Sequence, residues 1–415
     1  MAAKSALLCF LASAIMVTSC NQKEGTTNPP GNGSDSTYPP VETKAPNSPQ
    51  NKPAFEGQTR APGIKTKTEL DVKMLTDQLV NPWGIVALAD GRFLITEKAG
   101  TMRIASNTGQ VSAPITGLPA VNAAGQGGLL GVNIDPDFSS NRMVYWSFSE
   151  DQPGGTLTAV AKGRLADDEK TIENATVIYR ALPAFNSTLH YGSRIVFDKE
   201  GNLFVSTGER SDKESRPQAQ QLNSALGKIV RITKDGQPVA GNPFIGRGDA
   251  RPEIYSYGHR NTQGLAINPA TGELWNNEFG PRGGDEVNIV KPAKDYGWPT
   301  ITYGIEYGGQ TIGQGLTQKE GMEQPVYYWD PVVSPSGMVF YNADVIPEWK
   351  NNLFIGCLSG SHIVRLVIKD NKIVGEERLL EEENQRFRDV TVGKDGALYA
   401  VCDGQKGRLY RIGKK

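Results

Sequence analysis

The apolar positions of this chain fall into short strand-like runs that recur in pairs, and most pairs are joined by a turn built on Asp or Asn. Apolar runs of this length, bounded by turn residues, predict β-strands rather than helices. Six copies of the unit begin at Gly84, Gly131, Ile195, Gly264, Gly337 and Asp389. Their starts lie roughly 45 to 75 residues apart, a spacing that fits one four-stranded sheet per copy.

Repeated antiparallel sheets of this size predict an all-β fold, a six-bladed β-propeller over residues 66–415, in which radial stacking protects the strand edges. Two separate β-sandwiches are the alternative, but they do not explain why one turn recurs throughout. We expect residues 70–80 to pair with the last blade and close the ring. Because a propeller gathers loops from every blade at one end of its channel, residues distant in sequence can share one pocket.

The N-terminus has the pattern of an export signal. Lys4 precedes an apolar run over residues 6–17, which ends in Val17-Thr18-Ser19-Cys20. This ending resembles a bacterial lipoprotein cleavage box, so we expect residues 1–19 to be removed and Cys20 to be lipidated. An ordinary secretory signal with an incidental cysteine is the alternative. The lipoprotein interpretation predicts a protein anchored in the periplasm or on the bacterial cell surface.

The amino-acid composition predicts a tether and argues against several kinds of binding site. Residues 20–65 are rich in Pro, Gly, Asn, Ser and Thr, which predicts a disordered tether between anchor and propeller. The net charge of −1, with no basic stripe, argues against a nucleic-acid partner. Only three histidines occur in the chain, so a His-rich zinc or copper site is not expected. Cys357 and Cys402 are interpreted as separate buried thiols, although export also permits a disulfide.

Three polar clusters interrupt the strand pattern, and we expect them to converge on one site. They are Thr188-Leu189-His190-Tyr191-Gly192-Ser193-Arg194, Gly258-His259-Arg260-Asn261-Thr262-Gln263-Gly264, and Asn277-Glu278-Phe279-Gly280-Pro281-Arg282-Gly283-Gly284-Asp285-Glu286-Val287-Asn288. The third cluster is a loop crowded with carboxylates and backbone carbonyls, which suits a hard cation such as Ca²⁺.

Individual residues of these loops suggest chemistry. A neutral imidazole at His190 could accept a proton near neutral pH, although a lone loop histidine more often bonds to nearby backbone. Arg386 and Arg388 alternate, so on a strand they share one face. With Arg260 they could form a fork for an anionic ligand, or the pair could simply be neutralised by Glu381 to Glu383. Gln126 and Asn261 add neutral hydrogen-bonding groups at glycine-rich turns.

Taken together, the motifs resemble a known family. They are Gln126-Gly127-Gly128-Leu129-Leu130-Gly131, His190 with Arg194, the Gly258 to Gly264 run, Gly280-Pro281-Arg282-Gly283-Gly284-Asp285-Glu286, Asp295-Tyr296-Gly297-Trp298-Pro299 and Arg386-Phe387-Arg388-Asp389. In this order they are similar to the soluble glucose dehydrogenases and aldose sugar dehydrogenases, which use pyrroloquinoline quinone (PQQ) on a six-bladed propeller.

The resemblance implies a role for each matching residue. His190 would be the catalytic base, with Glu209 as an acidic residue near it. PQQ would be held by Gln126, Arg260, Asn261, Arg386 and Arg388, its carboxylates accounting for the arginines. The carbonyls of Gly280 and Pro281 would bind the Ca²⁺ that touches the quinone, and Asp285 or Glu286, with Tyr296, would form a further calcium site. The expected reaction is oxidation of an aldose sugar or similar alcohol.

The chain also departs from the family pattern. Leu358-Ser359-Gly360 stands where glucose-oxidising members carry a lysine, and Leu189 stands where they carry an aspartate. These changes keep two other functions open: a non-catalytic surface propeller that binds carbohydrate or protein, and a calcium-dependent lactonase. The sequence does not identify the sugar or the electron acceptor, and it leaves open whether the chain forms a homodimer.

Overall fold

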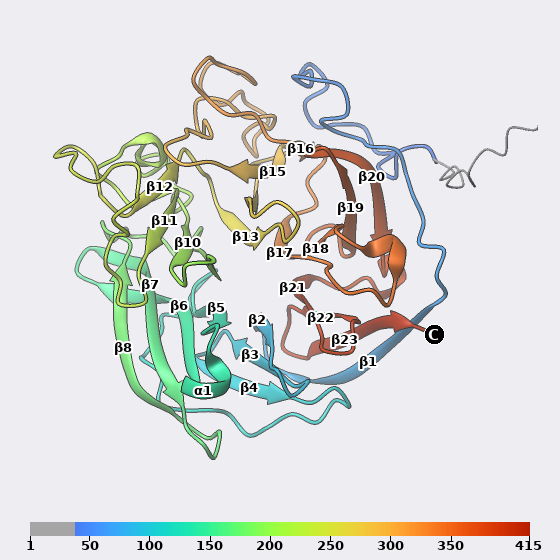
Figure 1. The fold of residues 1–415 in the computed structure, drawn as a ribbon. Helices are drawn as coiled ribbons and strands as arrows, with labels where there is room; N and C mark the ends of the chain where they lie inside the picture. The colour runs from blue at the N-terminus through green and yellow to red at the C-terminus, as the bar shows by residue number, and fades with distance from the viewer. Residues whose placement is uncertain (1–37) are drawn as a thin grey trace, which may run out of the picture. The chain divides into compact units, whose positions relative to one another are not determined.

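The computed structural model describes residues 38–415, so the expected signal peptide and the anchor at Cys20 lie outside the described part. Six antiparallel sheets surround a central axis (Figure 1). Neighbouring innermost strands contact one another around the whole ring, from β2 through β5, β9, β13, β17 and β21 back to β2. This arrangement confirms the predicted six-bladed β-propeller.

The strands follow one another from the axis outward in each blade. The first three blades contain β2 (Pro82–Ala87), β3 (Phe93–Glu97) and β4 (Thr101–Ala105); β5 (Leu129–Ile134), β6 (Met143–Gln152), β7 (Gly155–Leu165) and β8 (Ile172–Arg180); and β9 (Gly192–Phe197), β10 (Leu203–Thr207), β11 (Lys228–Ile232) and β12 (Ile254–Tyr257).

The last three blades contain β13 (Thr262–Ile267), β14 (Leu274–Glu278), β15 (Asp285–Val290) and β16 (Tyr327–Trp329); β17 (Pro335–Phe340), β18 (Leu353–Cys357), β19 (Ile363–Lys369) and β20 (Lys372–Leu379); and β21 (Phe387–Val392), β22 (Leu398–Cys402), β23 (Gly407–Lys414) and β1 (Leu70–Leu79). Helical structure among residues 38–415 is confined to α1 (Phe138–Asn141) and three short 3₁₀ turns (Arg216–Gln220, Pro347–Trp349 and Glu381–Glu383), and no described helix could cross a membrane.

The ring closes as the sequence predicts. The N-terminal strand β1 pairs antiparallel with β23, from Leu70 opposite Lys414 to Leu79 opposite Gly407. The last blade therefore takes its outer strand from the start of the propeller. This pairing ties the two ends of the propeller domain together without a covalent link.

One blade departs from the predicted four strands. The first sheet has three regular strands, and the chain beyond β4 contributes only isolated bridges from Val111 to Ala105 and from Ile115 to Met102. Pro114 lies between the two bridges and has no amide hydrogen, so a continuous ladder cannot form there.

An apolar cluster fills each interface between neighbouring blades. Between the fourth and fifth blades, for example, Trp275 meets Phe340 edge to face, with ring centroids 5.7 Å apart. The second strand of a blade lies between two neighbours, which is why β3, β10, β14, β18 and β22 are buried along their whole length. Cys357 and Cys402 are both free and buried, as expected.

The innermost strands approach closely at the glycine that begins most repeats. A Cβ atom on Gly264 would lie 2.5 Å from the backbone oxygen of Ser336 on the next inner strand. A side chain there would separate neighbouring blades, so the recurring glycine is a packing requirement of the ring.

The prediction of a disordered tether is wrong for residues 38–65. Gln58 is fully buried, its backbone oxygen accepts from the amide of Tyr328, and the Ala61 amide donates to the Tyr327 hydroxyl. The polar composition suggested disorder, but these polar groups are satisfied by specific partners on the propeller instead of by water. We call residues 38–65 the N-terminal strap.

Candidate active site

A cavity of about 360 Å³ brings together loops from several blades. Four of the predicted site residues line it: Gln126, His190, Arg386 and Arg388. A smaller cavity is lined by Arg260, Gly280, Glu286 and Tyr296, and Phe279 contributes to both spaces. The remaining predicted residues, Glu209, Asn261, Pro281 and Asp285, line neither cavity. The predicted convergence of distant loops is therefore confirmed.

His190 is held by two of the predicted residues. Its Nδ1 atom lies 2.6 Å from Oε1 of Glu209, and its backbone amide donates to the side-chain oxygen of Gln126 at 2.8 Å. Both the imidazole and the Glu209 side chain are buried. Because the carboxylate accepts the hydrogen on Nδ1, the lone pair is placed on Nε2.

The surroundings of His190 keep its ring neutral. Burial, followed by the positive charge of Arg260, lowers the pKa of His190 to about 4, against the raising effect of Glu209 and with a further lowering by Arg210. The imidazole is thus unprotonated at neutral pH. It can accept a proton without first releasing one.

A strained loop presents this ring. His190 has a φ of +49°, in the left-handed region that non-glycine residues rarely adopt, and Arg210 on the facing loop has a φ of +78°. The Arg210 guanidinium stacks over Tyr191 and donates to the carbonyls of Leu189, Thr156 and Ser187. These contacts hold the His190 loop in its unusual conformation.

Arg386 and Arg388 share a counterion. Asp403 lies 2.9 Å from the Arg388 guanidinium and 3.6 Å from that of Arg386, and it lines the same cavity. The alternative that Glu381–Glu383 neutralise the pair is not what the structure shows. The Arg388 guanidinium also lies over the Trp83 ring, 5.8 Å from its centroid.

Lys98 adds a further positive charge to the cavity. Its ammonium donates to the carbonyl of Gly125, next to Gln126. Burial lowers the pKa of Lys98, the negative charge of Asp403 raises it, and Arg388 lowers it. The cavity lining therefore includes three cations and one anion, a combination suited to an anionic ligand.

Arg260, which lines the smaller cavity, and the buried Asn261 both have unused hydrogen-bonding groups. Asn261 Oδ1 accepts from the Gly192 amide, whereas its Nδ2 is buried without a partner among residues 38–415, as is Nε of Arg260. Buried donors left open in this way are uncommon in folded proteins. They fit a ligand that presents oxygen acceptors.

The loop at residues 280–284 carries the carbonyls expected to bind a metal ion. The Gly280 carbonyl accepts from Arg260 Nη1 at 2.6 Å, and the buried Pro281 packs on Gly304. Asp285 supports the loop instead of facing a cavity, because its carboxylate accepts from the amides of Gly280, Val333 and Ser334. Burial raises the pKa of Asp285 to about 7, although these hydrogen bonds oppose that shift. The choice between Asp285 and Glu286 therefore favours Glu286.

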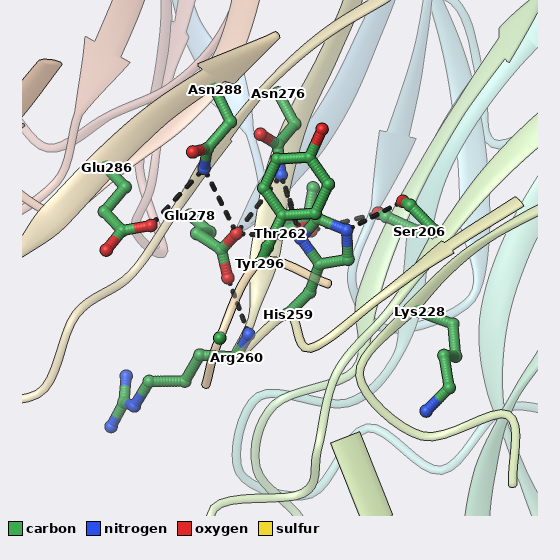
Figure 2. Close-up of polar contacts among 12 residues, drawn as sticks. Ser206, Lys228, His259, Arg260, Thr262, Asn276, Glu278, Glu286, Asn288 and Tyr296 are labelled. Carbon is green, nitrogen blue, oxygen red and sulfur yellow. Dashed lines mark hydrogen bonds and ion pairs between the residues drawn. The ribbon is translucent and has the colours of Figure 1, made fainter. Parts of the chain in front are cut away.

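The half-buried Glu286 lies opposite the buried carboxylate of Glu278. The two are directly paired across β14 and β15, and both line the small cavity. Burial and the charge of Glu278 raise the pKa of Glu286 well above its ordinary value. Figure 2 shows Glu278 bonded to His259 and to the amide of Arg260, with Glu286 beside it.

Tyr296 contributes less than expected to this site. Its ring stacks on His259 with centroids 4.6 Å apart (Figure 2). Its hydroxyl donates to the Ile289 carbonyl. The phenol oxygen is therefore already engaged. Residues 38–415 contain no group of three or more His, Cys, Asp or Glu side chains placed to hold a metal ion, so a cation here would depend on backbone oxygens as well.

Sequence reasoning missed several residues of the main cavity. Trp83 lines it from the inner strand β2, and Lys98, Tyr307 and Asp403 line it from three different loops. The Asn81-Pro82-Trp83-Gly84 run was a usable signal, because it precedes a repeat glycine as the Gln126 motif does. The others carry no pattern that separates them from ordinary surface residues.

Comparison with known proteins agrees with this geometry. The glucose / sorbosone dehydrogenase family profile matches residues 79–411. The aldose sugar dehydrogenase YliI of Escherichia coli strain K12 is 42% identical over 346 residues, which cover 83% of this chain and 92% of that protein.

The solved structures that this chain resembles include aldose sugar dehydrogenases as well. The apo-form of the soluble aldose sugar dehydrogenase from Escherichia coli superposes with a TM-score of 0.79 at 42% identity, covering 84% of this chain and all of that one. A PQQ-bound aldose sugar dehydrogenase from Streptomyces coelicolor superposes with a TM-score of 0.68 at 29% identity, covering 84% and 99% of the two chains. The chain described here belongs to the glucose / sorbosone dehydrogenase family.

Proposed function

We propose that this protein is a PQQ- and Ca²⁺-dependent dehydrogenase that oxidises an aldose sugar or a similar alcohol. The observation that carries the proposal is the position of His190: a neutral imidazole, oriented by Glu209, lines the same cavity as the Arg386 and Arg388 guanidiniums. A proton acceptor and an anion-binding group thus share one space. A lone structural histidine would not require that arrangement.

The residues present fit PQQ. The cofactor is a planar, multiply anionic quinone, and the cavity offers the cations of Lys98, Arg386 and Arg388 against the single carboxylate of Asp403. The open donors of Asn261 and Arg260 would add hydrogen bonds to its oxygen atoms. Gln126, which lines the same cavity, would add a neutral hydrogen-bonding group.

The residues also fit a calcium ion, although they offer fewer carboxylate ligands than a calcium site built mainly from Asp and Glu side chains. Gly280 and Pro281 would supply backbone oxygens beside the quinone. At the second site, a cation between Glu278 and Glu286 would relieve the repulsion between these two directly opposed carboxylates, one buried and one half-buried. Tyr296 would contribute its backbone oxygen.

In the reaction, Nε2 of His190 takes the proton from the substrate hydroxyl. Glu209 holds the ring in the required tautomer and stabilises the imidazolium that forms. Arg210 keeps the loop in position through its carbonyl contacts. When bound, PQQ supplies the acceptor for the hydride that leaves the substrate carbon, and Ca²⁺ polarises the quinone carbonyl as a Lewis acid.

The missing family lysine does not remove the positive charge from the site. Ser359 forms a 2.7 Å hydrogen bond with Ser334 at the cavity edge, while Lys98 reaches the cavity from the first blade. We take Lys98 to provide a compensating charge. Export and a lipid anchor at Cys20 remain part of the proposal.

Dye-linked sugar oxidation by the purified protein tests this function. Activity should appear when PQQ and Ca²⁺ are added to the apo-protein, and His190→Ala should abolish it while the circular dichroism spectrum is unchanged. A protein that does not bind PQQ at micromolar concentration would instead be the non-catalytic propeller. Hydrolysis of a lactone by PQQ-free protein would identify a lactonase.

A further inference from the structure

The N-terminal strap lies outside the region shared with the family, which begins at residue 79. It lies beside β16 and β20, where it is the blue segment in Figure 1. Gly63 pairs antiparallel with Tyr38 and parallel with Glu376 on β20, so the strap covers the outer edge of the fifth blade. Edge protection is one role for such a segment.

A second set of strap contacts converges on one buried carboxylate, that of Asp330. The backbone and side-chain amides of Asn47 donate to its Oδ1 at 2.8 and 3.0 Å, and the Ser48 amide donates to its Oδ2 at 2.9 Å. Arg60 of the strap donates to the Asp330 carbonyl. Hydrogen bonds to a carboxylate are among the stronger ones in proteins.

Asp330 in turn packs against the turn at residues 280–284, which carries the Gly280 and Pro281 carbonyls. A Cβ atom on Gly283 would lie 2.7 Å from Asp330 Oδ1. Asn47 reaches the same turn directly, because its side-chain oxygen accepts from Arg282 Nε at 3.1 Å. One flank of the turn is therefore fixed by the strap.

The other flank of the turn rests on Tyr303, which the strap also holds. Asn51 donates to the Tyr303 carbonyl at 2.9 Å, and the Tyr303 hydroxyl donates to the buried side chain of Gln58 at 3.0 Å. A Cβ atom on Gly284 would lie 3.0 Å from the Tyr303 carbonyl carbon. Movement of the strap would therefore release both sides of the turn.

We propose that the N-terminal strap is a positioning element for the metal-binding turn at residues 280–284, acting through Asp330 and Tyr303. The inference rests on the proposed function, because the turn matters only if its carbonyls bind the cation beside the cofactor. Asp330 and the strap do not touch the cofactor in this account. They set where the two carbonyl oxygens lie, and a small displacement of such ligands weakens the site they form.

The test measures the Ca²⁺ concentration that gives half-maximal PQQ binding, followed by cofactor absorbance in the full-length protein. Asp330→Asn removes an acceptor that faces backbone amides, and Asn47→Ala removes the contacts to Asp330 Oδ1 and Arg282 made by the side chain. Glu42→Gln is the matched control, since Glu42 pairs with Arg378 on β20 and does not contact the turn. We expect the first two variants to need about tenfold more Ca²⁺, a change in line with losing a hydrogen bond to a charged group, and the control to behave as wild type.

A strap that only protects the blade edge predicts a different pattern. All three variants would then unfold at lower urea concentration but keep the wild-type Ca²⁺ requirement, and that result would overturn the proposal. An equal increase in all three would overturn it as well. If wild-type protein does not bind PQQ with Ca²⁺, the proposed function itself fails, so the two failures are distinguishable.

Discussion

The Nδ1 atom of His190 lies 2.6 Å from Oε1 of Glu209, and the two residues flank the inner hairpin of the third blade in the sequence. His190 precedes β9 and Glu209 follows β10, so the antiparallel pairing of these strands brings the two side chains together. The pair is thus a direct product of the blade architecture. It places an oriented, neutral base at the cavity wall.

Replacing Glu209 by Gln should lower kcat about a hundredfold, because the amide no longer stabilises the imidazolium that forms when His190 takes the proton. Sugar oxidation with saturating PQQ and Ca²⁺ measures the effect. Glu214→Gln, on the same loop but exposed, is the control and should retain wild-type kcat. An unchanged kcat in Glu209→Gln would remove the carboxylate from the mechanism.

The pH dependence of His190 gives a second prediction. Its folded pKa of about 4 lies below the ordinary value of 6.5, so the unfolded chain binds more protons than the folded protein between these values. Stability should therefore decrease as pH falls from about 6.5 to about 4. Because His190 stays in its unprotonated, basic form over this range, kcat/KM should not decline until the pH approaches about 4. Histidine NMR signals of the apo-protein, from three residues only, report the titration directly. A His190 midpoint near 6.5 would contradict the buried, neutral base.

Lys98 should contribute to cofactor binding in place of the missing lysine. Lys98→Met should raise the Kd for PQQ about tenfold, the effect expected from losing one charge-assisted contact. Lys98→Arg retains the charge and should bind nearly as wild type, and Ser359→Lys added to Lys98→Met should recover part of the affinity. If Lys98→Met binds PQQ as tightly as wild type, Lys98 has only a local role at Gly125.

The buried ion pair between Arg194 and Asp389 should be important for stability. The two charged groups are 2.6 Å apart, and Asp389 also accepts from the Ile85 amide of the first blade. Asp389→Asn leaves the buried guanidinium without its counterion and should cost about 3 kcal/mol of unfolding free energy in urea denaturation. Asp249→Asn, in the exposed pair with Arg247, should leave the urea midpoint unchanged. Equal midpoints for both variants would contradict the assigned role.

The fold was predictable because the ring repeats one local requirement. Each blade needs an inner strand that approaches its neighbours closely, and glycines such as Gly131 and Gly264 mark that strand in the sequence. The closing pair of β1 and β23 was also predictable, since a ring of blades must join its ends. Neither inference depends on long-range side-chain detail.

The candidate site was only partly predictable. His190 and the two arginines could be placed because loops of a propeller converge, whereas Lys98 and Asp403 depend on which side chain of a loop turns inward. The strap was missed for a different reason: its polar groups are satisfied by particular partners such as Asp330. Composition describes how much apolar surface a segment has, but not where its hydrogen bonds go.

Titration of the apo-protein with PQQ, with and without Ca²⁺, tests the central claim most directly. We predict a saturable change in cofactor absorbance that requires Ca²⁺ and is weakened in Arg388→Ala, while His190→Ala still binds the cofactor but does not reduce it with sugar. Absence of saturable binding to folded wild-type protein, or binding unaffected by Arg388→Ala, would contradict it.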